Sequence, residues 1–395
     1  MTIGWVLPQA IALLLLSVNG SLANDIYINQ VGNNADITIV QEGESNVISS
    51  VTSNTRKAPI SGNNTSTTFT QTGDNNDIGV YMSAGNGQQT ITQTGDSNAA
   101  VADCHGNNCV LSITQDGNDN YAKAEAGNGG DYDQSITITQ DGNDNLVIAE
   151  MNGDDNSMTV TQDGNNHSVY GFGNSPVTGD RNTLTLVQNG SQYEQAEVKV
   201  VGDDNTIDGY QGGNGESNFA RLQLNGDNNT VTSWQGKTAA GAVSNLEGGD
   251  HEVFWTITGD NNTAGSYQSD QAATCCASAH HQSHIITGDN NNVIVKQRKN
   301  GGHDGFVEVQ GSNNYVSLYQ TTNAYQFGDI VLNGDGHSVT GYQGGGGSHS
   351  MSIDLNYGAG AYTVNTQQNS NTNQTYNLTG TCTNAAGCGV SVVQN

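Results

Sequence analysis

Polar and apolar positions alternate in short stretches along the chain, and each stretch ends at a glycine flanked by asparagine or aspartate. Residues 135–145, SITITQDGNDN, show the pattern in its simplest form. A β-strand places successive side chains on opposite faces, so Ile136, Ile138 and Gln140 are predicted to share one face. The glycine and its polar neighbours are typical of a tight turn. The stretch therefore predicts a short strand followed by a turn.

Close copies of this stretch follow one another at a nearly constant interval of about 22 residues. Their turn glycines are Gly73, Gly95, Gly117, Gly142 and Gly164. Another turn glycine, Gly153, lies midway between Gly142 and Gly164. The unit is therefore a strand and a turn of about 11 residues, usually paired into a rung of about twice that length.

An isolated rung is not expected to fold. Its ordering costs about 1–2 kcal/mol per residue in backbone entropy, whereas each of its few buried apolar side chains contributes roughly 1.5–3 kcal/mol. Stacked rungs share their strands with neighbours, so we expect an all-β protein, a β-solenoid of strand-turn-strand-turn rungs. Its two flat parallel sheets would lie face to face, about 10 Å apart. Division of residues 24–395 by the rung length predicts about 17 rungs.

Stacking also explains how polar side chains can point inward. Equivalent residues on successive rungs would form columns with a spacing of about 4.8 Å. Glutamine and asparagine each carry a donor and an acceptor, so such a column satisfies its own hydrogen bonds. The predicted assembly ladder consists of Gln71, Gln93, Gln115, Gln140 and Gln162, of Asn76, Asn98, Asn120 and Asn145, and of Asn262 and Gln268 in a later copy.

Composition narrows the possible functions. Hydrophobic residues make up 33% and charged residues 12% of the chain, below the roughly 45–50% and 25% of ordinary globular proteins, so a conventional core is not expected. The net charge of −28 argues against nucleic acid or an anionic membrane as a direct partner. The sequence has no nucleophile elbow, phosphate loop or metalloprotease motif, so we expect neither an enzyme nor a cofactor.

The N-terminus and the regularity of the repeats divide the chain into three regions. Residues 1–23 contain an apolar run and small residues near their end, which is typical of a secretory signal peptide. The mature chain is predicted to begin at Asn24 and to be exported through the periplasm to the outside of the cell. Residues 24–240 contain the regular repeats, and residues 241–395 contain more degenerate repeats with insertions and a C-terminal cysteine pair.

The repeat resembles the curlin repeat, the unit of curli-type functional amyloid in bacterial biofilms. That family has the pattern Ser-x5-Gln-x-Gly-x2-Asn-x-Ala-x3-Gln, and Gly259, Asn262, Ala264 and Gln268 match its second half. The resemblance implies a secreted, fimbria-like fibre subunit that polymerises with its own copies by end-to-end stacking of rungs, in a biofilm matrix and in adhesion to cell or host surfaces. It also implies a nucleator and an outer-membrane secretion channel as partners.

Other functions stay open at this level. A monomeric surface adhesin or a minor, nucleating subunit could use the outward threonine and tyrosine faces to bind a ligand or a host surface. The regular outward pairs, such as Thr137 and Thr139, are also compatible with an ice-binding solenoid, although threonine is simply a good exposed strand former. Stacked turn acids such as Asp74 and Asp96 are expected to slow uncontrolled growth by repulsion, with calcium bridging as the alternative.

Four of the six cysteines flank turns in pairs. Cys104 and Cys109 lie on either side of a turn and are predicted to point inward and to form a disulfide, with free buried thiols as the alternative. Cys382 and Cys388 bracket TNAAG in a similar way and predict a second bridge near the C-terminus. An oxidising destination outside the cytoplasm is consistent with such bridges.

The remaining cysteines, Cys275 and Cys276, lie in an insertion close to His280, His281 and His284. We favour a loop or intermolecular disulfide over a metal site for this pair.

Three other histidines occupy the turn position that usually holds asparagine: His167, His251 and His337. They are expected to replace asparagine as hydrogen-bonding residues, with a pH-sensitive turn as the alternative.

Overall fold

The computed structural model describes residues 13–16, 24–27, 33–49, 60, 62–80, 82, 85–104, 108–126, 133–171, 177–190, 193–213, 217–236, 250–269, 279–299, 301–355, 360–384 and 386–395. Every helix or strand assigned in these residues is a β-strand. The chain divides into two compact units, unit 1 (Met1–Arg181) and unit 2 (Asn182–Asn395). No helix in the described part of the chain is long and apolar enough to span a membrane.

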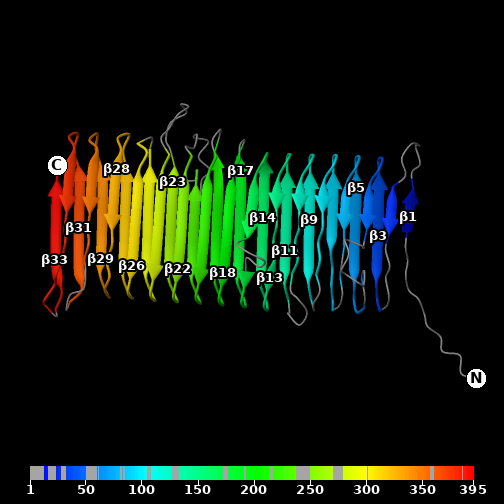
Figure 1. Cartoon of the computed structure of the whole chain (residues 1–395), viewed down its shortest axis with the longest axis horizontal. Helices are drawn as coiled ribbons and strands as arrows, with labels where there is room; N and C mark the ends of the chain where they lie inside the picture. Colours follow the sequence, from blue (N-terminus) through cyan, green and yellow to red (C-terminus); the bar gives the residue numbers. More distant parts are fainter. Residues whose placement is uncertain are drawn as a thin grey trace, which may run out of the picture. The chain divides into compact units, whose positions relative to one another are not determined.

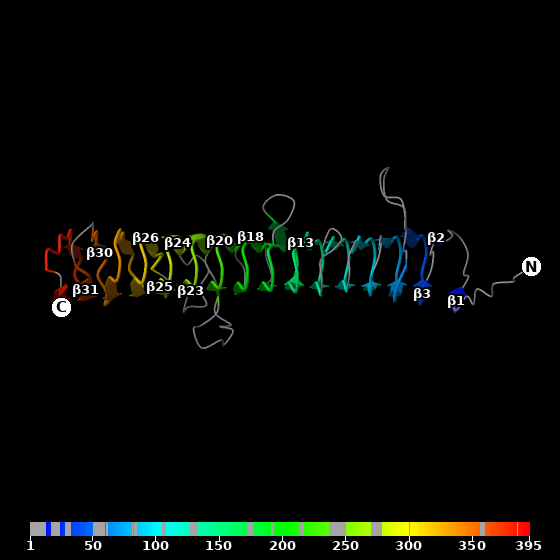
Figure 2. The same ribbon diagram turned by 90° about the horizontal axis from the view of Figure 1, so that it is seen from below.

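Unit 1 contains two layers of parallel strands (Figures 1 and 2). Its sheet A consists of β1 (Leu13–Leu16), β3 (Asp36–Glu42), β5 (Ser66–Thr72), β7 (Thr90–Thr94), β9 (Val110–Asp116), β11 (Ser135–Asp141) and β14 (Ser157–Gly164). Its sheet B consists of β2 (Asp25–Tyr27), β4 (Val47–Ser49), β6 (Asp77–Gly79), β8 (Ala99–Ala100), β10 (Tyr121–Ala122), β12 (Leu146–Val147) and β15 (Ser168–Gly171), with the neighbouring pair β13 (Met151–Asn152) and β16 (Val177–Thr178).

Unit 2 repeats this arrangement with longer strands in its second layer. Its sheet A consists of β17 (Thr183–Gly190), β19 (Thr206–Gly213), β21 (Thr230–Gln235), β23 (Thr263–Ser269), β25 (Asn292–Arg298), β27 (Tyr315–Thr321), β29 (Ser338–Gly344), β31 (Tyr362–Asn369) and β33 (Cys388–Gln394). Its sheet B consists of β18 (Gln195–Val201), β20 (Phe219–Asn225), β22 (Glu252–Thr258), β24 (His281–Thr287), β26 (Asp304–Gln310), β28 (Gln326–Ile330), β30 (His349–Ser352) and β32 (Gln374–Asn377).

The predicted fold class is confirmed, because both units are β-solenoids of parallel, stacked rungs. In the described residues, sheet A has seven strands in unit 1 and nine in unit 2. Without β1, which precedes residue 24, fifteen described sheet A strands lie within residues 24–395, slightly below the number of rungs, about 17, that a constant period predicts. The difference arises from insertions, which lengthen the sequence separation between equivalent residues to as much as 33, as between Gln235 and Gln268.

Equivalent residues lie directly opposite one another on neighbouring strands. Ile136 pairs with Leu111 on one side and with Met158 on the other, and Gln140 pairs with Gln115 and Gln162. Burial alternates along β11 as predicted: the side chains facing the other sheet are buried, and the threonines between them are partly exposed. The threonine pairs of unit 1 therefore form an outward array in register.

The tight spacing of the rungs dictates glycine at the turns. Gly142 has a φ of +119°, and a Cβ placed there would lie 1.9 Å from the carbonyl oxygen of Gly164 on the next rung. Two residues later, Asp144 has a φ of +57°, a left-handed conformation that asparagine and aspartate tolerate better than most side chains. The recurring turn sequence therefore combines close backbone approach with a left-handed residue.

Candidate functional site

The predicted glutamines of unit 1 form one continuous buried column in sheet A. Each side-chain amide donates from Nε2 to Oε1 of the glutamine on the next rung, at 2.7 Å from Gln41 to Gln71, 3.0 Å from Gln71 to Gln93, 2.8 Å from Gln93 to Gln115, 2.8 Å from Gln115 to Gln140 and 2.9 Å from Gln140 to Gln162. Nε2 also donates to a main-chain carbonyl of sheet B, as from Gln93 to Asp77 at 3.1 Å. Both amide protons are thus used in the interior.

The predicted asparagines form a second column at the turn that follows these glutamines. Asn98 illustrates the bonding: its main-chain N–H and its Nδ2 both donate to Oδ1 of Asn76, at 3.0 and 3.1 Å, and Nδ2 also donates to the Gly117 carbonyl at 2.7 Å. The column begins at Asn24, whose Oδ1 accepts the N–H of Asn46 at 3.0 Å. The bonds between side-chain amides run in the opposite direction to those of the glutamines. Each asparagine amide donates to the asparagine of the preceding rung, whereas each glutamine amide donates to the glutamine of the next rung.

The turn acids belong to a third, exposed column. Oδ1 of Asp74 accepts the N–H of Glu44 at 2.7 Å, and Oδ1 of Asp96 accepts the N–H of Asp74 at 2.8 Å. Asn118 and Asn143 continue the same bonding without charge. Each carboxylate therefore accepts a main-chain N–H from the turn of the neighbouring rung, in addition to contributing negative charge.

Unit 2 keeps the glutamine column but places its asparagines at the other turn. Its glutamines are Gln188, Gln211, Gln235, Gln268, Gln297, Gln320, Gln343, Gln368 and Gln394, joined by amide bonds of 2.8–3.2 Å. Its asparagines precede the strands of sheet A and are Asn182, Asn205, Asn229, Asn262, Asn291 and Asn314. In unit 1 the asparagine column follows those strands. Asn262 and Gln268, predicted as ladder members, lie in these two columns of unit 2.

The other turn of unit 2 carries a buried column of ionisable residues, of which only His251 was predicted from the sequence to hold a turn position. Glu194 accepts bonds from the N–H and Nδ2 of Asn218, at 3.0 and 3.1 Å. Three histidines continue the column, with Nδ1 of His251 accepting the N–H of His280 and Nδ1 of His280 accepting the N–H of His303, at 3.3 and 3.0 Å. Their rings stack at centroid distances of 4.8 Å. In this column, imidazole rings accept the main-chain bonds that side-chain amides accept in the asparagine column.

Burial changes the protonation of this region. It raises the pKa of Glu194 to about 8, which the bonds from Asn218 oppose, and it lowers the pKa of His280 to about 3. The same cause lowers the pKa of His284 to about 3. At neutral pH the glutamic acid is therefore protonated and both histidines are uncharged, as a dry interior requires.

The other two histidines predicted at turns also make the hydrogen bonds that asparagine makes at this position. The N–H of His167 donates to Oδ1 of Asn145 at 3.0 Å, and Nδ1 of His337 accepts the N–H of Tyr362 at 3.0 Å. Both side chains are buried.

The histidines near the predicted cysteine insertion do not converge. His280 lies in the turn column, His284 stacks on Trp255 at 3.9 Å, and His281 lies 3.0 Å from Glu252 on the outer face. Cys275 and Cys276 lie outside the described residues. Within the described part of the chain, no three His, Cys, Asp or Glu side chains are placed to hold a metal ion.

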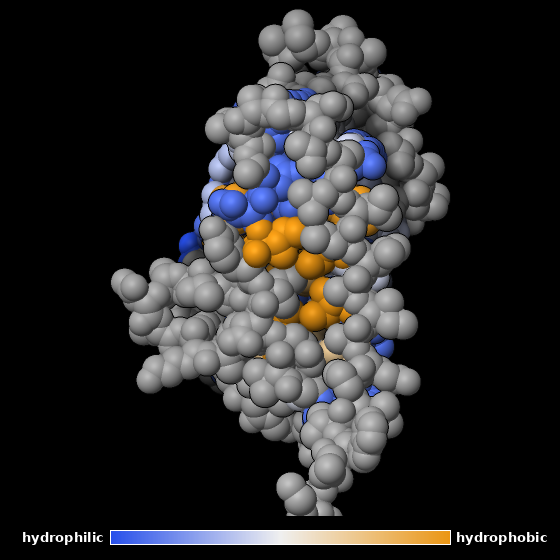
Figure 3. Space-filling view, turned by 90° about the vertical axis from the view of Figure 1, so that its right-hand side faces the viewer, coloured by the Kyte–Doolittle hydropathy of each residue, from blue (hydrophilic) through white to orange (hydrophobic). Residues whose placement is uncertain are grey.

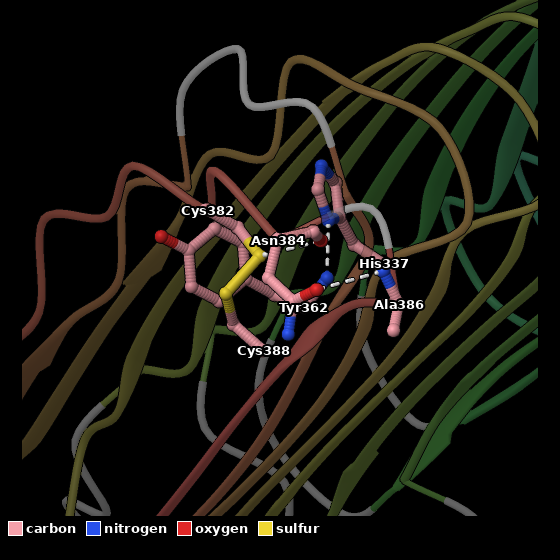
Figure 4. The surroundings of a disulfide bond; sticks show 6 residues. All are labelled: His337, Tyr362, Cys382, Asn384, Ala386 and Cys388. Carbon is pink, nitrogen blue, oxygen red and sulfur yellow. Dashed lines mark hydrogen bonds between the residues drawn. A yellow bond between two sulfur atoms is a disulfide. The ribbon is translucent and has the colours of Figure 1, made fainter.

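Both predicted turn disulfides are present. Cys104 and Cys109 are joined and buried in unit 1. In unit 2, Cys382 is joined to Cys388 beside the ring of Tyr362, and Asn384 holds the intervening turn by accepting the N–H of Ala386 at 3.1 Å (Figure 4). At this end of the unit, His337, Tyr362 and Cys388 occupy the positions that continue the asparagine column. The asparagine column therefore stops before the last rung, whereas the glutamine column reaches Gln394.

The first glutamine of the unit 1 column and the last glutamine of the unit 2 column have hydrogen-bonding capacity that the described residues do not use. No described residue donates to Oε1 of Gln41, and Nε2 of Gln394 makes only a long bond of 3.3 Å to the Thr375 carbonyl. At the N-terminal end, β1 pairs with β3 over residues 38–41. At the C-terminal end, β33 is the last strand of sheet A in the described residues.

These features define the class of protein: a β-solenoid whose rungs are joined by inward amide columns. Residues 133–164, which include β11, match the family model of the curlin associated repeat. The chain therefore carries a curlin associated repeat toward the C-terminal end of unit 1, over β11 and β14. No curated protein matches the chain significantly.

Proposed function

We propose that the protein is a secreted structural subunit of extracellular, curli-like fibres, in which copies stack end to end to build biofilm matrix and to mediate adhesion. The observation that carries the proposal is the glutamine column, whose members are hydrogen-bonded to one another inside each unit. At its ends, Oε1 of Gln41 accepts no bond from a described residue, and Nε2 of Gln394 makes only one long bond. The curlin associated repeat at residues 133–164 supports the same role. The role is structural and requires neither catalysis nor a cofactor.

The polarity of the column gives assembly a direction. Every glutamine donates to the next rung toward the C-terminus, so Gln394 ends the column with an available donor and Gln41 begins it with an available acceptor. The C-terminal edge of one copy and the N-terminal edge of another are complementary. Two identical edges would instead bring donor to donor or acceptor to acceptor. The subunits are therefore expected to join head to tail.

The apolar residues of the two edges fit the same register. Val390 and Val392 of β33 follow the inward positions of β31, and Ile37 and Ile39 of β3 precede the inward positions of β5. All four are only partly buried at the ends of their units. When Gln394 meets Gln41 of the next copy, Val390 lies over Ile37 and Val392 over Ile39. Docking would thus bury apolar surface that each end leaves exposed.

Processing would open the N-terminal edge. β1 covers part of β3 and belongs to the residues predicted as the signal peptide. Its removal would leave the main-chain groups of β3 unpaired, and an unpaired strand edge templates the addition of another strand. The view onto this end of unit 1 shows a band of apolar side chains beside hydrophilic ones (Figure 3).

Seeded elongation by edge variants tests the proposal. Val392→Lys places a charge on the inward face of β33, where docking would bury it without a partner, whereas Val393→Lys changes the adjacent outward side chain, which is 58% exposed. Sheared fibres of the mature chain, residues 24–395, serve as seeds, and thioflavin fluorescence reports growth. We expect Val392→Lys chains not to extend the seeds through their own β33 edge. Val393→Lys chains should extend the seeds as the unmodified chain does. Equal growth of the two variants would contradict docking through β33.

A further inference from the structure

One outward column of unit 2 differs from all the others in its chemistry. It runs across five neighbouring strands of sheet A, drawn in yellow-green to orange in Figure 1, and contains one residue from each rung. We call it the aromatic stripe, and its members are Trp234, Tyr267, Lys296, Tyr319 and Tyr342. At the rung spacing of about 4.8 Å, the stripe is about 19 Å long.

Contacts along the stripe hold its side chains side by side. The rings of Trp234 and Tyr267 are 5.3 Å apart, and those of Tyr319 and Tyr342 are 5.5 Å apart. Nζ of Lys296 lies 5.2 Å from the centre of the Tyr267 ring. In the neighbouring outward column, the guanidinium carbon of Arg298 lies 5.7 Å from the Tyr319 ring. The cations and rings therefore form two contact groups, one with Lys296 and one with Arg298, which adjoin where Lys296 pairs in register with Tyr319.

Glycines let two of the rings lie down along their strands. A Cβ at Gly344 would lie 2.6 Å from Oη of Tyr342, and a Cβ at Gly265 would lie 3.0 Å from Cε2 of Tyr267. Each ring therefore covers the backbone two residues away. Because both tyrosines remain partly exposed, one ring face rests on the sheet and the other is turned toward solvent.

The charge on the strands of the stripe is opposite to that of the protein, and the nearest acid is Asp208 on β19, whose Oδ2 accepts a bond from Nε1 of Trp234 at 3.2 Å at the edge of the stripe. The chain carries 38 acidic and 10 basic residues. The five strands of the stripe, β21 to β29 in sheet A, contain no aspartate or glutamate and carry Lys296 and Arg298. Hydroxyl groups flank the stripe on outward positions, at Thr232, Ser317 and Thr340. The surface thus offers flat apolar faces, two cations and hydrogen-bonding hydroxyls.

The equivalent column of unit 1 provides a contrast within the same chain. Its members, each directly before a ladder glutamine, are Val40 and five threonines: Thr70, Thr92, Thr114, Thr139 and Thr161. The rung therefore folds with threonine at this position, and the aromatic residues are not needed to build it.

We infer that the aromatic stripe is a binding site for an acidic polysaccharide, a chain of pyranose rings that carry carboxylates. The apolar faces of sugar rings stack on flat aromatic rings, the carboxylates pair with Lys296 and Arg298, and sugar hydroxyls bond to the flanking hydroxyl groups. An extended chain lying across the rungs matches a surface that repeats once per strand. This inference goes beyond fibre formation, since it concerns the outer face and needs only a single folded chain.

Titration with three polymers separates rings from charge. The probes are polygalacturonate, its fully methyl-esterified form, which keeps the rings and loses the charge, and polyglutamate, which keeps the charge and lacks the rings. Calorimetry uses the freshly purified, unassembled mature chain at constant ionic strength. We expect binding of polygalacturonate, and weaker binding of the other two polymers by on the order of ten-fold or more in Kd, because each lacks one of the two contacts.

Variants assign the binding to the stripe. Substitution of Tyr267, Tyr319 and Tyr342 together by threonine gives unit 2 the side chain that unit 1 uses, and it should weaken polygalacturonate binding on the order of ten-fold or more. The control, Phe254→Thr with Phe327→Thr, removes two exposed aromatic residues from sheet B and should leave Kd unchanged. Far-UV circular dichroism verifies that both variants keep their strands.

Three results would overturn the inference: no binding of polygalacturonate by the folded chain, equal affinity for polyglutamate, or unchanged affinity in the tyrosine variant.

Discussion

Replacement of one glutamine inside the column tests whether the amide bonds stabilise the stack. Gln115 accepts a bond from Gln93 and donates one to Gln140, both at 2.8 Å. Gln115→Leu keeps the approximate volume and removes one partner from each neighbouring glutamine, and also the bond from Gln115 Nε2 to the Ala99 carbonyl at 3.1 Å. Three such losses cost about 3–9 kcal/mol, whereas the added apolar burial contributes about 1.5–3 kcal/mol. The free energy of unfolding should therefore fall by about 4 kcal/mol.

Urea unfolding of the mature chain, followed by far-UV circular dichroism at pH 7, measures this difference. The control is Thr114→Leu, because Thr114 is the exposed neighbour on the same strand, and its effect should stay within about 0.5 kcal/mol. The double variant Gln115→Leu/Gln140→Leu should cost about 1 kcal/mol less than the sum of the single variants, since their shared bond is lost only once. A Gln115→Leu chain as stable as the unmodified protein would refute the reasoning.

Three further changes test the turns and the C-terminal end. Gly142→Ala should lower stability by at least about 3 kcal/mol in urea, since its Cβ would lie 1.9 Å from a carbonyl oxygen, whereas Gly389→Ala, which meets nothing within 4 Å, should change it by less than about 1 kcal/mol; equal effects would contradict the spacing of the turns. His280 stays neutral in the fold, with its pKa lowered to about 3 by burial, while the unfolded chain takes up this proton below about pH 6.5. Its contribution to stability is therefore lost as the pH falls from about 6.5 to 3, by about 1.4 kcal/mol per pH unit. His280→Asn should lower the slope between pH 6 and pH 5 by that amount and leave the equal share of His284; an unchanged slope would show that His280 is not a titrating group. Cys382→Ser with Cys388→Ser opens a loop with a sequence separation of 6 and should cost about 2 kcal/mol, which the same urea assay would report; no loss of stability would argue against a role for this bridge in holding the last rung.

Much of the fold follows from spacing that is visible in the sequence. Gln71, Gln93 and Gln115 recur with a sequence separation of 22, in phase with turn glycines, and only stacking in register explains why such polar residues alternate with apolar ones on one face. The same register placed Cys104 and Cys109 on inward positions beside one turn. Sequence spacing succeeds here because strand periodicity and rung length are both nearly constant in unit 1.

The histidine column was predicted only at His251, because its register is hidden by insertions. Its members, Glu194, Asn218, His251, His280 and His303, have successive sequence separations of 24, 33, 29 and 23, so no constant period joins them. The change of the asparagine column from one turn to the other, between unit 1 and unit 2, is hidden for a related reason. Both turns share the sequence Gly-x-x-Asn, and only the pairing of the strands shows which turn each copy forms. The direction of the amide bonds has no signature in the sequence at all.

The repeat position that distinguishes the two units could have been found by alignment of the rungs. The residue before each ladder glutamine is threonine in five rungs of unit 1 and aromatic or basic in six rungs of unit 2, of which Tyr210 is buried. Its consequence, a flat surface that carries Lys296 and Arg298 on an acidic protein, depends on ring orientations that only the structure provides.

X-ray diffraction from aligned fibres of the mature chain tests the central claim most directly. If copies join head to tail through β33 and β3, strands run across the fibre. The pattern should then show a meridional reflection at about 4.8 Å and an equatorial reflection at about 10 Å. A concentrated preparation that remains soluble and monomeric, or fibres without the meridional reflection, would contradict it.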